Sequence, residues 1–87
     1  QTPALYFWRD HKGAEIDCII DKGSKLLPVE LKSSSTFHSD FLKNIVSWQN
    51  LKGNKNKEGY LIYNGKNEFS VKDIDVINWQ RIPDKIF

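Results

Sequence analysis

Two strand-like segments joined by a tight turn constrain the fold of this chain more than any other part of its sequence. The first covers residues 15–21, the second residues 25–32, and the turn between them reads Asp-Lys-Gly-Ser. Side chains alternate between the two faces of a strand, so each segment divides into an apolar side and a side with charged residues. The pair therefore predicts a β-hairpin with one buried face.

The expected register of this hairpin gathers charged side chains on one face. If the first and last residues of the turn pair, Glu15 lies opposite Glu30, with Asp17 and Lys32 on the same face one or two pairs away. The apolar residues of both segments then meet on the reverse face. A slip by one residue would destroy this agreement, so the pattern predicts that three acids and a lysine converge.

This cluster has a chemical and a structural interpretation. Like charges opposite one another on a sheet cost about 0.2–1 kcal/mol, and a cation between them removes that cost. Mg²⁺ prefers oxygen ligands and activates bound water, while Lys32 suits the charge that develops on a phosphorus centre. The cluster thus predicts metal-dependent phosphodiester hydrolysis. The alternative is the solvated face of a half-buried strand.

Several short motifs carry a family resemblance. Residues 6–9 (Tyr-Phe-Trp-Arg), 13–17 (Gly-Ala-Glu-Ile-Asp) and 28–34 (Pro-Val-Glu-Leu-Lys-Ser-Ser) resemble the C-terminal domain of a bacterial and archaeal family of predicted P-loop ATPases. Asp17, a strand and then Glu30-Leu31-Lys32 also resemble the D…(D/E)xK signature of the PD-(D/E)xK nuclease superfamily. The resemblance covers residues 6–37 well and extends loosely to residue 63.

The resemblance implies roles for individual residues. Asp17 and Glu30 would be metal ligands, with the backbone carbonyl of Leu31 as a third, Lys32 the catalytic lysine, and Glu15 a second acidic position that tunes the site. It also implies Mg²⁺ as the cofactor and DNA as the substrate. Active members commonly add an acidic residue from a helix before the first strand. This sequence contains no such helix, which either lies upstream in the parent protein or is absent. A catalytically silent DNA- or protein-interaction domain therefore stays open, as does a toxin–antitoxin or defence component.

The remaining sequence predicts a small α/β domain of the restriction-endonuclease-like type, a mixed sheet with a flanking helix. We expect a helix over residues 39–52, capped by Ser39, with Phe41, Ile45 and Trp48 on one apolar stripe. Pro28 should face a strand edge or a bulge, because it lacks an amide donor. The list of other expected strands is 5–9, 59–63, 68–71 and 75–79.

Composition limits the other functions and partners. The 87 residues form one expected domain, 1–87, the C-terminal piece of a larger ATPase, whose P-loop domain is the expected partner within the parent chain. The fragment lacks a phosphate-binding Gly-rich loop, so ATP would bind elsewhere. A single cysteine, Cys18, excludes an internal disulfide, and we expect a cytoplasmic protein that does not enter membranes. The oligomeric state does not follow from the sequence.

Two further features have open interpretations. The basic loop at residues 52–57 suits either a phosphate backbone or solvent. Trp8, Trp48 and Trp79 are suited to stacking on bases, but in so small a domain we expect them to fill the core.

Overall fold

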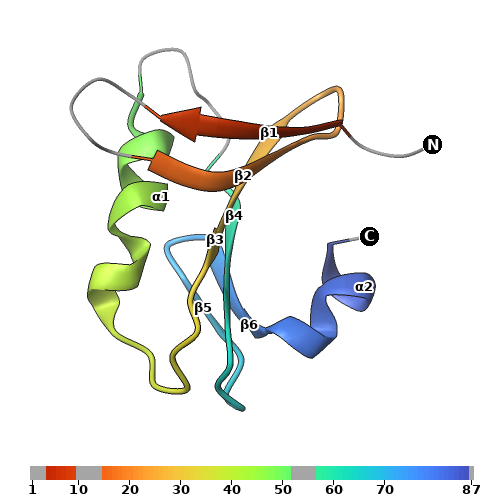
Figure 1. Ribbon diagram of the computed structural model, residues 1–87. Helices are drawn as coiled ribbons and strands as arrows, with labels where there is room; N and C mark the ends of the chain where they lie inside the picture. The colour runs from red at the N-terminus through yellow and green to blue at the C-terminus, as the bar shows by residue number, and fades with distance from the viewer. Residues whose placement is uncertain (1–3, 10–14, 52–56, 87) are drawn as a thin grey trace.

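The computed structural model describes residues 4–9, 15–51 and 57–86, which form a small mixed α/β domain around one sheet (Figure 1). In the described residues the sheet has six strands in the order β1-β2-β3-β4-β6-β5. The elements are β1 (Ala4–Arg9), β2 (Glu15–Asp21), β3 (Leu26–Leu31), the 3₁₀ helix η1 (Ser39–Leu42), α1 (Lys43–Gln49), β4 (Gly59–Tyr63), β5 (Phe69–Val71), β6 (Ile74–Asn78), the 3₁₀ helix η2 (Trp79–Arg81) and α2 (Ile82–Lys85).

The sheet joins an antiparallel half to a parallel half. Strands β1, β2 and β3 pair antiparallel, whereas β3, β4 and β6 run parallel to one another, and β5 pairs antiparallel with β6. Helix α1 connects β3 to β4, and α2 follows β6 on the other side of the sheet (Figure 1). The C-terminal ends of β3, β4 and β6 therefore lie side by side at the same end of the sheet, which we call the parallel-strand edge.

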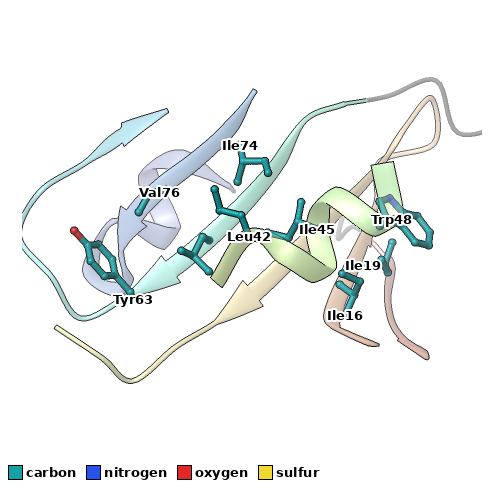
Figure 2. Close-up of a cluster of buried hydrophobic side chains, with 9 residues drawn as sticks. Ile16, Ile19, Leu42, Ile45, Trp48, Tyr63, Ile74 and Val76 are labelled. Carbon is teal, nitrogen blue, oxygen red and sulfur yellow. The ribbon is translucent and has the colours of Figure 1, made fainter. Parts of the chain in front are cut away.

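Each face of the sheet buries its own apolar cluster. The larger cluster lies beneath α1 and includes Ile45, Leu61 and Val76, each fully buried (Figure 2). The smaller cluster, on the opposite face, packs Ile20 and Ile62 against residues of the C-terminal segment. Ile45 is the central residue of the apolar stripe expected on the helix, and its burial confirms that stripe. Burial of the stripe holds the helix against the sheet.

A β-bulge in β2 changes the expected alternation of side chains. Between the pairs Tyr6↔Ile19 and Trp8↔Ile16, β1 has one residue and β2 has two. An extra residue of this kind interrupts the alternation of a strand. Ile16 and Ile19 consequently point into the same cluster beneath α1, although they would otherwise lie on opposite faces (Figure 2). Regular alternation along the strand predicts that Ile16 and Cys18 share the apolar face, and this is wrong, because Cys18 packs against the cluster on the opposite face.

The helical segments also differ from the expected ones. The α-helix proper is only Lys43–Gln49, preceded by a 3₁₀ turn whose N-cap is His38 rather than Ser39. The end expected at residue 52 lies outside the described residues. A second helix, α2, was missed because its four residues carry too little periodicity to stand out. No helix in the described part of the chain is long and apolar enough to cross a membrane.

Pro28 lies in a central strand and not at the edge of the sheet. Alternate residues of a strand direct their amides to the same neighbour, and the Lys32 amide donates to the Ile62 carbonyl of β4 (2.8 Å). The backbone nitrogen of residue 28 therefore also points to β4, but the β3–β4 ladder begins only at Val29. The proline ring occupies the place before the ladder starts, where it contacts Gly59 so closely that an added Cβ there would lie 3.2 Å from its Cγ.

Candidate active site

The hairpin register places a different pair of acids together from the one expected. The β2–β3 ladder runs from Asp21↔Leu26 to Cys18↔Val29, two residues away from the expected register. The turn is longer because the Asp21 carboxylate accepts a hydrogen bond from the Gly23 amide (2.8 Å), and Gly23 adopts φ +87°. A shift by two residues preserves the predicted faces of β3.

Asp17 and Glu30 occupy the next positions beyond the end of this ladder. Each carboxylate replaces a missing ladder bond: Glu30 Oε1 accepts from the Asp17 amide (3.0 Å), and Asp17 Oδ2 accepts from the Leu31 amide (2.9 Å). Both bonds lie beside the bulge in β2, where the ladder with β3 has ended. The two acids are thus held side by side, and the expected Glu15–Glu30 pairing is wrong because Asp17 takes that place.

Glu30 is the buried member of the pair, with a relative exposure of 3%. Burial raises the pKa of the Glu30 carboxyl above its ordinary value, and the negative charge of Asp17 raises it further. The Asp17 amide, a hydrogen bond with the Asn44 side chain and the charge of Lys32 act in the opposite direction. A carboxyl that is poorly solvated and faces a second acid has a clear electrostatic reason to bind a cation.

Lys32 follows Glu30 by two residues and lies on the same side of the sheet as α1. Its ammonium is 5.4 Å from the centroid of the Phe41 ring, a cation–π distance. Its positive charge lowers the pKa of Glu30, so the two groups interact electrostatically. The structure therefore brings Asp17, Glu30 and Lys32 together.

Glu15 makes a different contact. Its carboxylate forms an ion pair with Arg9 of β1, with Nη2 to Oε2 at 3.0 Å, and accepts a hydrogen bond from Arg9 Nε at the same distance. Within the described residues, no three His, Cys, Asp or Glu side chains are grouped closely enough to hold a metal ion. Glu15 thus does not complete a three-acid group with Asp17 and Glu30, and its role in tuning the site stays a prediction.

The oxygen atoms that surround the acid pair suit a hard cation. The amide of Leu31 points to Asp17 of β2, and the carbonyl of a strand residue points to the same side as its amide, so the Leu31 carbonyl also faces β2. Two carboxylates and one carbonyl form the kind of oxygen donor set that binds Mg²⁺ with several retained waters. The residues therefore fit the metal that the resemblance implies.

Asn44 is a site residue that the sequence analysis missed. It lies on α1, and its side chain is close enough to Glu30 to lower the pKa of that carboxyl. Its position in the sequence could have identified it, since Asn44 follows Phe41 by three residues and precedes Trp48 by four. This spacing places a polar side chain within the buried stripe of the helix. A polar residue at such a position usually has a buried partner.

Lys57 is the part of the basic loop at residues 52–57 that the structure describes, since residues 52–56 lie outside the described residues. The Lys57 ammonium donates to the carbonyl of Gln49, while the Gln49 side chain donates to the carbonyl of Lys57. This reciprocal pair ties the end of α1 to the start of β4.

Comparison with protein families gives a match over most of the chain. The model of the family "Domain of unknown function (DUF4143)" matches residues 1–82, nearly the whole chain. The chain belongs to the DUF4143 family. No protein of curated function matches it. The matched range of the DUF4143 domain includes Asp17, Glu30, Leu31 and Lys32, so the acid pair and the lysine are parts of the family region and not of a flanking segment.

Proposed function

We propose that this DUF4143 domain is a nuclease-like module of the PD-(D/E)xK type, the C-terminal part of a P-loop ATPase, which hydrolyses phosphodiester bonds in DNA with Mg²⁺. The observation that supports the proposal is the Asp17–Glu30 pair: Glu30 accepts a hydrogen bond from the Asp17 amide (3.0 Å), Asp17 accepts one from the Leu31 amide (2.9 Å), and Lys32 follows directly after β3. The mixed sheet with a flanking helix agrees with the fold that the resemblance implies.

The residues of the chain divide the work as follows. Asp17, Glu30 and the Leu31 carbonyl would hold Mg²⁺, which when bound supplies a Lewis acid and a water of lowered pKa. The Leu31 amide orients Asp17, and the Asp17 amide and Asn44 orient Glu30, so the donor atoms are preorganised before any ligand arrives. Lys32 neutralises the negative charge that grows on the phosphate.

A cleavage assay with matched variants tests the proposal. We expect the wild-type chain to cut DNA, offered as single strands, duplexes and supercoiled plasmid, only when Mg²⁺ is added. Asp17→Asn and Lys32→Ala should each reduce the rate by about 100-fold or more, because each removes a group that acts on the reacting phosphate.

The control for that assay is Asp73→Asn. It makes the same change as Asp17→Asn, but at an exposed turn with φ 67° between β5 and β6, a backbone conformation that Asn adopts readily. Its rate should equal the wild-type rate. Absence of Mg²⁺-dependent cutting of every DNA form, or equal rates for Asp17→Asn and wild type, would refute the nuclease proposal.

A second function, a silent interaction domain, is favoured by a specific observation. Both acids already have a structural role, because each accepts a hydrogen bond from a backbone amide where the β2–β3 ladder ends. Such bonds justify the acids without any metal. Thermal unfolding with and without Mg²⁺ separates the two functions: a metal site at 100 times its Kd gains about 2.7 kcal/mol of stability, and a silent pair gains nothing.

A further inference from the structure

Trp79 is the tryptophan that does not follow the expectation of a core role. Trp48 is buried, and Trp8 packs against it edge-to-face with ring centroids 5.3 Å apart. Trp79 begins η2 directly after β6, and 54% of its surface is exposed. An exposed Trp forfeits the large gain from burial that this side chain usually provides, so its placement calls for another explanation.

Hydrogen bonds hold this exposed ring in one orientation. The indole Nε1–H donates to the side-chain oxygen Oδ1 of Asn64 (3.1 Å). The backbone amide of Asn64 donates to the Ser34 carbonyl (3.0 Å). The Asn64 side chain also reaches the Ser35 hydroxyl (3.5 Å). The ring is thus tied through its polar edge to the loops that follow β4 and β3, while about half of the side chain stays exposed to solvent.

The backbone beneath Trp79 is fixed as well. Asn78 Oδ1 accepts from the Gln80 amide (2.9 Å), and Asn78 Nδ2 donates to the Gly65 carbonyl (2.7 Å). The same asparagine therefore caps η2 and joins it to the β4–β5 turn. Because the orientation is already set, binding a flat ligand on this ring costs little side-chain entropy.

A cation is exposed in the turn that adjoins Trp79. This cation is Lys66, and Arg81 pairs with both nearby acids, Glu68 (3.3 Å) and Asp84 (3.6 Å). The opposite end of the sheet, at the N-terminal ends of β4 and β6, is acidic. A shallow pocket of about 360 Å³ there is lined by three acids, Glu58, Asp73 and Asp75.

We propose that Trp79 is a stacking platform for an unpaired base of a single-stranded DNA, at the parallel-strand edge. Ligands of sheets with parallel strands commonly bind outside the carboxyl ends of those strands, and aromatic rings that stack on bases beside cationic groups are the usual device for holding single strands. This inference deepens the proposed function and rests on it for the choice of DNA as the ligand.

The platform lies within reach of the candidate active site. Ser34, whose carbonyl holds Asn64, follows Glu30 by four residues, so their Cα atoms are at most about 14 Å apart. A short single strand can therefore span both places. Trp79 would then fix the strand at one point while the scissile phosphate approaches Asp17 and Glu30.

Fluorescence anisotropy in EDTA tests the platform without any cleavage. The probes are a labelled oligothymidylate and an abasic strand of the same length, which keeps the phosphates and lacks the bases. We expect wild type to bind the oligothymidylate about 5- to 150-fold more tightly than the abasic strand, the range observed for losing one stacked base. Trp79→Ala should remove that preference, whereas Trp79→Phe, which keeps a ring, should retain part of it.

Phe7→Ala is the matched control, since it also truncates an exposed aromatic side chain (63% exposed), but on β1 at one end of the sheet. It should leave the preference for bases intact. Equal affinity of wild type for both strands, no binding of either, or equal losses in Trp79→Ala and Phe7→Ala would overturn the inference, and capture of a protein partner through Trp79 without base preference would do the same. The wild-type comparison needs no variant, so poor folding of Trp79→Ala leaves the test decisive. If binding depends on Trp79 but the protein never cuts DNA, the nuclease proposal is refuted and the stacking platform is not.

Discussion

Replacing Glu30 by glutamine should make the protein progressively more stable than wild type as the pH rises. Glutamine keeps an oxygen that can accept from the Asp17 amide, as Glu30 Oε1 does at 3.0 Å, but it cannot ionise. In wild type, burial and then the charge of Asp17 raise the pKa of Glu30. Ionising this carboxyl in the folded protein is therefore harder than ionising it in the unfolded chain.

The sign of the effect follows from proton linkage. Below the unfolded pKa, Glu30 is protonated in both states, and wild type keeps the full contribution of the neutral carboxyl. As the pH rises through the folded pKa, the folded state holds a proton that the unfolded chain has released, so wild type loses stability. The variant does not titrate at position 30, so the difference in unfolding free energy between Glu30→Gln and wild type grows with pH.

The size of the change follows from the same relation. Each unit by which the folded pKa exceeds the unfolded one is worth about 1.4 kcal/mol. In a domain of this length, that free energy corresponds to a difference of about 5 to 11 °C in Tm. At pH 4 we expect the two proteins to differ by less than about 1 kcal/mol, since a neutral hydrogen-bonding group occupies the position in both.

Urea unfolding at pH 4, 5, 6, 7 and 8 without divalent ions measures the effect. Glu58→Gln is the matched control: its exposed ion pair with Lys25 should be worth less than about 1 kcal/mol at every pH. A difference between Glu30→Gln and wild type that stays constant from pH 4 to 8, or that shifts in favour of wild type as the pH rises, would contradict the burial argument. Adding Mg²⁺ at pH 8 should narrow the gap, because only wild type can offer a charged ligand there.

Three further substitutions test the packing around the site. Ile45→Ala, at a fully buried position of α1, should cost about 2–5 kcal/mol in urea unfolding. A loss below 1 kcal/mol would mean that α1 does not pack as described. Gly65→Ala should cost about 1–3 kcal/mol, since an added Cβ would lie 2.3 Å from the ring of buried Tyr63; an unchanged Tm would contradict that contact. Arg9→Ala should cost at most about 1 kcal/mol and less at high salt, because its ion pair with Glu15 is exposed; a salt-independent loss would point to packing instead.

Local patterns in the sequence were enough for the hairpin and for most of the sheet. Alternation of apolar and polar residues identified β2 and β3, and the family motifs selected Asp17, Glu30 and Lys32, which the structure indeed brings together. Alternation has a period of two residues and is visible in any single strand. For that reason a register that differs by two residues leaves the predicted faces of β3 unchanged.

The partner of each acid could be found only in the folded chain. The bulge in β2 arises from its pairing with β1, and nothing within residues 15–21 marks it. It lies where the ladder with β3 has ended, and there Glu30 accepts the amide of Asp17 while Asp17 accepts the amide of Leu31. The position of Trp79 likewise depends on three chain segments that meet at the parallel-strand edge. Contacts between distant segments have no local period to reveal them, because they depend on how whole strands align.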